Sequence, residues 1–191
     1  IIPANTLSAA AYDVANSCRF NGVDDYHGKT VGTPSGQRKG TFSMWVKRAL
    51  QDTNKSMLAT MFKSSSILFA IYFDSSNRLN AYCEQSSTAI FSFITSAKYR
   101  DPSAWYHICV NFDTTDGTAG DRIKIFVNGT RVTAFGTSTN NCDQNTDLEM
   151  FESGTTLSCG GGTAGQSSFE SFFGGYIAEY VFIDNTDYVA S

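Results

Sequence analysis

Apolar and polar side chains alternate along several stretches of this chain, and this pattern limits its fold more than any other feature. The clearest stretch is 105–113, WYHICVNFD, and the next is 122–127, RIKIFV, which ends in Asn128-Gly129. A period of two places successive side chains on opposite faces of an extended strand. Asn-Gly after such a run indicates a hairpin, because both residues tolerate positive φ.

Shorter runs of the same kind recur between clusters of turn residues. They are 17–21, 41–47, 57–62, 67–73, 78–83, 89–94 and 175–183. Helical periodicity is almost absent. Many short strands separated by turns predict an all-β fold in which two antiparallel sheets form a sandwich.

The length of 191 residues fits one β-sandwich domain over 1–191. The chain starts at Ile1 and ends just after a strand-like run, so we expect it to be part of a longer protein. The segment 136–172 is rich in Gly, Ser and Thr, and only 148–151 in it has the pattern of a strand. We therefore predict a long loop region there, of the kind that is often functional.

Charge and hydropathy exclude two classes of partner. The formal net charge is -4, from 14 basic and 18 acidic residues, and no basic stripe stands out. A protein that binds nucleic acid needs such a stripe to neutralise phosphates, so we expect no nucleic-acid partner. No apolar run reaches the roughly 20 residues that a membrane-spanning helix needs, so we expect no membrane span.

The five cysteines fit neither a disulfide framework nor a zinc site, because their number is odd and none form a C-x-x-C pair. Cys18 and Cys109 lie in strand-like runs and are predicted to be buried, reduced thiols. Cys142 and Cys159 flank a loop, and pairing between them in an oxidising compartment stays an alternative.

The sequence offers no recognisable catalytic set. Glycosidases use two carboxylates that converge on one face, but Glu149 and Glu152 are three residues apart and Asp24 and Asp25 are adjacent. His107 can share a face with Cys109, yet nothing near them marks an oxyanion site. We interpret His107 as a strand residue bonded to a neighbour and predict that the domain is not an enzyme.

Five blocks in order resemble the concanavalin A-like lectin/glucanase domain of the laminin-G-like jelly-roll type. They are SCRFNGVDDY (17–26), TFSMWVKR (41–48), RDPSAWYHICVNFDTT (100–115), DRIKIFVNGTRV (121–132) and FFGGYIAEYVFID (172–184). The resemblance extends over roughly 5–185. The blocks are especially similar to the versions of this domain in structural proteins of tailed bacteriophages, notably marine ones.

The resemblance implies a virion component such as a tail fibre, spike or head appendage, assembled in the host cytoplasm. Its implied partners are other virion proteins and a host-surface glycan, and a homo-oligomer, such as a trimer, is expected on a fibre. A purely structural assembly or decoration module is the alternative, and a carbohydrate-active enzyme module is a weaker one. The family often holds a structural calcium ion near the first turn and the closing strand. Asp24, Asp25 and Glu179 stand at the matching positions, and the alternative is that the acidic residues of the turn are plain solvated turn residues.

Aromatic side chains are the candidates for a sugar platform, because their flat faces stack on the C–H groups of pyranose rings. Alternation puts Trp45 opposite the other apolar residues of 41–47, so one of these two sets faces away from the core. Trp105 starts its strand, and we expect it to anchor the core. The candidate ligand-binding residues are therefore Trp45, Tyr72, Tyr82 and Phe126.

Overall fold

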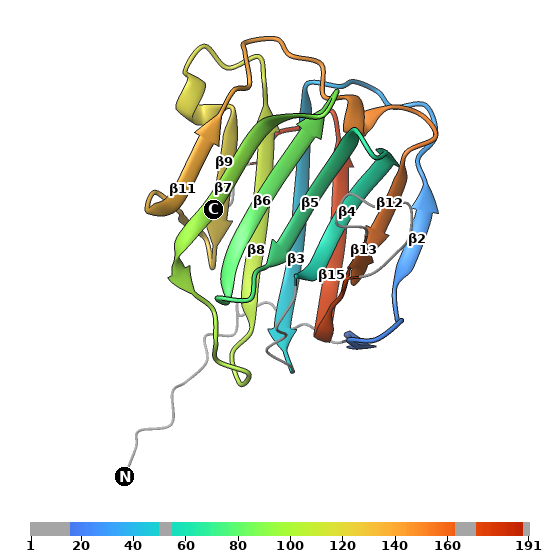
Figure 1. Ribbon diagram of the computed structural model, residues 1–191, viewed down its shortest axis with the longest axis vertical. Helices are drawn as coiled ribbons and strands as arrows, with labels where there is room; N and C mark the ends of the chain where they lie inside the picture. Colours follow the sequence, from blue (N-terminus) through green and yellow to red (C-terminus); the bar gives the residue numbers. More distant parts are fainter. Residues whose placement is uncertain (1–15, 50–54, 163–170, 189–191) are drawn as a thin grey trace, which may run out of the picture.

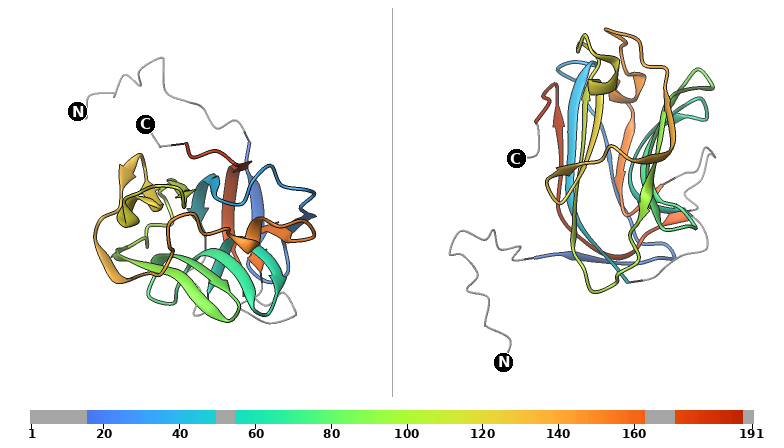
Figure 2. Two further views of the ribbon diagram at one scale, coloured as in Figure 1. Left: turned by 90° about the horizontal axis from the view of Figure 1, so that it is seen from above. Right: turned by 90° about the vertical axis from the view of Figure 1, so that its left-hand side faces the viewer.

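Two antiparallel sheets lie face to face in the computed structural model, which describes residues 16–49, 55–162 and 171–188 (Figures 1 and 2). The six-stranded sheet has the order β1 (Cys18–Asn21), β15 (Gly174–Asp184), β3 (Lys39–Arg48), β8 (Tyr106–Asp113), β9 (Ile123–Val127) and β10 (Thr130–Arg131). The seven-stranded sheet has the order β11 (Phe135–Asn140), β7 (Thr88–Lys98), β6 (Arg78–Gln85), β5 (Ile67–Phe73), β4 (Ser56–Ser64), β12 (Thr156–Cys159) and β2 (His27–Thr30). The predicted all-β, two-sheet antiparallel sandwich is confirmed.

Four short elements complete the described fold. β13 (Gly161–Gly162) pairs with β14 (Ser171–Phe172), and the 3-10 turns η1 (Ala119–Asp121) and η2 (Glu149–Phe151) lie in the connections. In Figure 1 the seven-stranded sheet is in front, and Figure 2 shows the two layers from the side. No helix in these residues has the length and hydrophobicity that a bilayer crossing requires.

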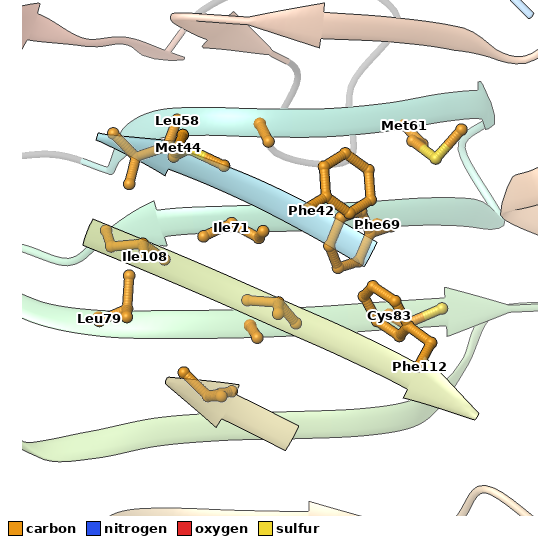
Figure 3. Close-up of a cluster of buried hydrophobic side chains, with 14 of the residues drawn as sticks. Phe42, Met44, Leu58, Met61, Phe69, Ile71, Leu79, Cys83, Ile108 and Phe112 are labelled. Atoms are coloured by element: carbon orange, nitrogen blue, oxygen red, sulfur yellow. The ribbon is translucent and has the colours of Figure 1, made fainter. Parts of the chain in front are cut away.

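The core lies between the sheets and is built by the alternation seen in the sequence. Phe42, Met44 and Val46 of β3 point inward, and the matching residues of β5 and β8 meet them (Figure 3). The ring of Phe42 lies 5.0 Å from that of Phe69 and 6.1 Å from that of Phe112. Burial of each such ring stabilises the fold by about 1.5–3 kcal/mol, and the close ring contacts add to this.

The hairpin predicted at Asn128-Gly129 is confirmed. Asn128 has a φ of 51° and Gly129 a φ of 75°, the two positive values of a type I′ turn, and the turn joins β9 to β10. The strand at 67–73 also has the predicted bounds, and the other predicted strands, apart from 148–151, differ from the observed ones only at their ends.

The prediction of a long loop over 136–172 is wrong where four strands, β11 to β14, lie in it, and its residues 163–170 are outside the part of the chain that the structure describes. β11 lies at one edge of the seven-stranded sheet, and β12 lies between β4 and β2. The residues 148–151, predicted as a strand, contain the 3-10 turn η2 instead. The small and polar side chains of β11 and β12 have low β propensity, so the sequence does not predict these two strands. They form because neighbouring strands supply hydrogen-bond partners. For the same reason β2, with the sequence HGKT, gave no signal.

The described cysteines are all free thiols, so Cys142 and Cys159 do not pair with each other. Cys109 is buried, as predicted, but Cys18 is exposed. The difference arises because β1 is an edge strand of its sheet and is four residues long. Its inward-facing residue Cys18 therefore lies at the open side of the sandwich, whereas Phe20 on the same face is covered.

Candidate functional site

The outer face of the six-stranded sheet carries an ordered grid of side chains. Since Met44 and Val46 point into the core, the residues that alternate with them on β3 point outward. Strand pairing aligns these with outward residues of β15, β8 and β9. The rows across the sheet are Ala178–Trp45–His107–Asn128, Val181–Ser43–Cys109–Phe126 and Ile183–Thr41–Asn111–Lys124.

A solvent-open groove with a volume of about 810 Å³ runs over this grid, and we call it the tryptophan groove. Trp45 and Trp105 line it together with His107, and each of the three side chains is partly exposed. The rings of Trp45 and His107 lie 5.0 Å apart, tilted by 41°. Both tryptophans of the chain therefore line one groove.

Polar groups are fixed on the floor and rim of the tryptophan groove. Ser43 Oγ lies 2.9 Å from His107 Nε2, within a hydrogen bond. Asn128 Oδ1 accepts a hydrogen bond of 2.8 Å from the backbone N–H of His107, which holds the hairpin turn against β8. Burial lowers the pKa of His107 from its ordinary 6.5, while the negative charge of Glu179 opposes this shift. Burial has the larger effect, so the neutral ring can both donate and accept hydrogen bonds near neutral pH.

A β-bulge shapes one rim of the groove. Pairing of β15 with β3 shifts register between Ala178 and Val181, and Glu179 in the bulge has a φ of 50°. Left-handed backbone at a residue other than glycine is uncommon, and bulges often redirect side chains beside functional sites. The bulge leaves Glu179 in solvent and Val181 42% exposed beside Trp45 and Ser43.

The C-terminal end of the described chain closes the other end of the groove. The backbone N–H of Tyr188 donates to Thr41 Oγ1 at 3.0 Å, and the Thr41 hydroxyl donates to the carbonyl of Thr186 at 2.9 Å. Lys124 Nζ pairs with Asp187 Oδ2 at 3.0 Å on the same face. These bonds hold residues 186–188 across β3, β8 and β9.

The four predicted aromatic candidates do not meet at one site. Phe126 lies on the groove face opposite Cys109 but is only 5% exposed, so its ring is covered. Tyr72 and Tyr82 are on the outer face of the other sheet, because their neighbours in β5 and β6 point into the core. Lys55 Nζ lies 5.3 Å from the centre of the Tyr72 ring, and the Tyr82 hydroxyl donates to Glu84. Of the four, Trp45 alone lines the tryptophan groove.

The three residues matched to a family calcium site are not brought together. Asn21, at the end of β1 next to the turn, pairs with Gly174 at the start of β15. The opposite end of β1, Cys18, pairs with Ile177, and Glu179 lies further along β15 than Ile177. Five residues of strand, roughly 16 Å at about 3.3 Å per residue, separate Glu179 from the turn that holds Asp24 and Asp25. In that turn, Asp24 Oδ1 and Asp25 Oδ2 accept hydrogen bonds of 2.7 and 3.0 Å from Asn21. No group of three or more His, Cys, Asp or Glu side chains in the described residues is placed to share a metal ion.

The groove holds the parts of a hydrogen-bonding surface rather than those of a nucleophilic centre. Burial raises the pKa of the Cys109 thiol to about 11, so the thiol stays protonated near neutral pH and is a poor nucleophile. Ser43 does bond to His107, but in the described residues no carboxylate accepts a hydrogen bond from the other nitrogen of this ring. A Ser-His pair lacks the group that orients its base in a triad.

Trp105 is the groove residue that sequence reasoning assigned wrongly. Placed just before β8, it was expected to anchor the core, but it lines the tryptophan groove. The alternation itself held the signal: Trp105 has the same parity as His107 and Cys109, the outward residues of this strand.

Comparison with known proteins agrees with this fold. The chain matches the family model described as the concanavalin A-like lectin/glucanases superfamily over residues 21–186. No curated protein matches it.

Solved structures of the same architecture come from animals and bacteria. A heptameric SAP-like pentraxin from Limulus polyphemus has a TM-score of 0.60 at 17% identity, over 90% of this chain and 77% of that one. Domains LG4-5 of the mouse laminin alpha1 chain give 0.62 at 14% identity, over 95% of this chain and 46% of that one. The CBM40 of the Ruminococcus gnavus IT-sialidase, bound to alpha2,3 sialyllactose, has a TM-score of 0.54 at 15% identity, over 82% of this chain and 91% of that one. Identities this low show a shared fold alone, but the family match spans most of the sequence. The chain therefore belongs to the concanavalin A-like lectin/glucanase superfamily.

Proposed function

We propose that this domain is a non-catalytic glycan-binding module and that the tryptophan groove is its binding site. The observation that carries the proposal is the joint exposure of Trp45, Trp105 and His107 in one open groove. Large aromatic side chains are seldom left partly exposed together without a ligand or partner, and indole faces suit the C–H surfaces of sugars.

Besides aromatic faces, a sugar-binding site needs polar groups, and the groove supplies them. Hydroxyl groups of a sugar need fixed donors and acceptors, and Ser43 and His107 on strands and Asn128 in the hairpin turn supply both. The volume of about 810 Å³ falls within the usual range for small-ligand sites. The solved complex of the sialidase CBM40 with sialyllactose shows that a related fold serves a binding role in that protein.

We also propose that the domain belongs to a structural protein of a tailed bacteriophage virion and contacts the host surface there. The support is the resemblance of the five sequence blocks, from SCRFNGVDDY to FFGGYIAEYVFID, to domains of that kind. Mass spectrometry of purified virions tests this context: peptides of this chain at structural stoichiometry are expected, and their absence from intact particles refutes the proposal.

A glycan array with host polysaccharides, probed with the purified domain, tests the binding function. We expect specific binding that Trp45→Ala and Trp105→Ala each weaken by about fivefold or more, since loss of one aromatic stack costs on the order of 1–3 kcal/mol. Tyr72→Ala and Tyr82→Ala are the matched controls, because they remove partly exposed aromatic rings from the opposite sheet. A parallel array with a calcium chelator tests the family calcium site; equal binding with and without chelator argues against a calcium requirement.

A structural assembly module is the competing function, and two exposed apolar side chains favour it. Val181 is 42% and Tyr188 57% exposed, and both line the tryptophan groove. Two results together would assign the groove to a protein contact instead. The folded domain would bind no glycan on the array, and it would self-associate in sedimentation experiments in a way that Val181→Ser abolishes.

A further inference from the structure

A row of cations and aromatic rings lies beside the tryptophan groove. Strand pairing aligns Arg19 of β1 with Tyr176 of β15, and Tyr176 with Lys47 of β3. Paired residues share one face, and here it is the outer face, because the alternating residues Phe20, Val46 and Ile177 are in the core. Neighbours across a sheet lie about 5 Å apart, so the three side chains form one surface.

The row is continuous with the groove. Lys47 is two residues from Trp45 on the same face of β3, a separation of about 7 Å. The register of β3 and β8 aligns Val46 with Tyr106, which puts Trp105 opposite Lys47. Trp105 therefore lies at the junction, as a lining residue of the groove and the next position in the row.

The two cations of the row are available to a ligand. Arg19 is exposed and Lys47 is half-exposed, and neither takes part in the ion pairs found within 16–49, 55–162 and 171–188. Other cations of the chain are paired, for example Lys124 with Asp187 at 3.0 Å.

Two acidic groups, Asp101 and Glu179, lie near this row, and hydrogen bonds from Ser103 together with the smaller effect of the Lys47 charge lower the pKa of Asp101. Asp101 Oδ1 accepts hydrogen bonds from the Ser103 backbone N–H at 2.8 Å and from its hydroxyl at 2.6 Å, so that oxygen is engaged within its own loop. Glu179 is exposed in the bulge, beyond the neighbouring pair Ala178–Trp45 and three residues along β15 from Tyr176.

We propose that the glycan is acidic and that Arg19, Tyr176 and Lys47 bind its carboxylate or sulfate group beside the tryptophan groove. A guanidinium fork binds carboxylate and sulfate oxygens through two parallel hydrogen bonds, and an ammonium adds a point charge. Tyr176 and Trp105 offer ring faces to the sugar that bears the anion. This inference rests on the proposed function and deepens it, since it names the ligand class of the same site.

The test is a binding array of matched neutral and acidic polysaccharides: dextran, carboxymethyl dextran, dextran sulfate, polygalacturonate and its methyl ester. We expect acidic members to bind more tightly than their neutral counterparts. The double variant Arg19→Gln/Lys47→Gln should weaken binding to acidic members about tenfold or more and leave neutral members unchanged. The control Lys29→Gln/Lys98→Gln removes the same charge from exposed positions of the other sheet and should change nothing.

Each outcome decides one claim. Binding to the carboxylated members without dextran sulfate identifies a carboxylate, and the reverse identifies a sulfate ester. Equal binding to neutral and acidic members, or equal losses in the two double variants, overturns the acidic subsite but leaves the glycan-binding function intact. If no member binds and Trp45→Ala also has no effect on the glycan array, both claims fail together.

Discussion

Gly160 is the position where a single methyl group should most clearly report on the packing of the sandwich. Its φ is +79°, and a Cβ added there would lie 2.2 Å from Cε1 of Phe20, a core residue that is 3% exposed. Gly160 also accepts a hydrogen bond of 2.8 Å from the backbone N–H of Phe173, so the backbone has little freedom to move away.

Gly160→Ala should destabilise the fold by about 2–5 kcal/mol. The left-handed backbone costs an L-residue about 1–2 kcal/mol, and overpacking against Phe20 adds about 1–3 kcal/mol. Gly154→Ala is the matched control, because Gly154 has a φ of +86° and nothing within 4 Å of the added Cβ. Gly154→Ala should therefore lower the free energy of unfolding only by the backbone contribution of about 1–2 kcal/mol.

Urea unfolding measures the free energy of unfolding of both variants. The difference between the two values isolates the contact with Phe20. Phe20→Leu in the Gly160→Ala background should recover part of it, so that the double-mutant cycle shows coupling between the two positions. Equal destabilisation by Gly160→Ala and Gly154→Ala, within about 0.5 kcal/mol, would refute the close packing of Phe20 against Gly160.

Three further results are expected. A thiol reagent should modify the exposed Cys18 rapidly in the folded protein and should reach Cys83 and Cys159 only on unfolding. Both of these thiols are buried, and burial raises their pKa, that of Cys159 to about 12. Rapid labelling of either thiol in the native state contradicts their burial. The pKa of His107, measured by NMR titration, should lie below 6.5, so the unfolded chain binds this proton more readily and stability falls as pH drops through 6.5 toward the folded pKa. A value above 6.5 would mean that Glu179 outweighs burial. Phe112→Ala should lower the free energy of unfolding by about 3–5 kcal/mol in urea titrations, since the ring is fully buried against other aromatic rings, and a loss below about 1 kcal/mol would contradict the core.

The fold class was predictable because alternation is a local signal with a direct physical cause. A strand such as Tyr106–Asp113 must bury one face, so its apolar parity states which side chains enter the core. β2 and β11 carry no such parity, since they lie at the edges of the seven-stranded sheet and are largely exposed. Their formation depends on partners distant in the sequence, which a local pattern does not contain.

The site was predictable only in part for the same reason. Parity placed Trp45 on the face opposite Phe42, Met44 and Val46, but it does not say which face is the outer one or which other outward residues share that sheet. Tyr72 and Tyr82 have equally good patterns and lie on the opposite side of the molecule. Trp105 and the row of Arg19 and Lys47 became recognisable only once register aligned β1, β15, β3 and β8.

The two tryptophans make the central claim directly measurable, because the chain has no others and both line the groove. Proton–nitrogen correlation spectra of the domain should show two indole N–H signals, one from Trp45 and one from Trp105. We predict that titration with a polysaccharide bound in the array shifts both signals at the concentration where binding occurs. Binding that leaves both signals unmoved while resonances of Tyr72 or Tyr82 shift would place the glycan on the seven-stranded sheet and contradict the assignment of the tryptophan groove.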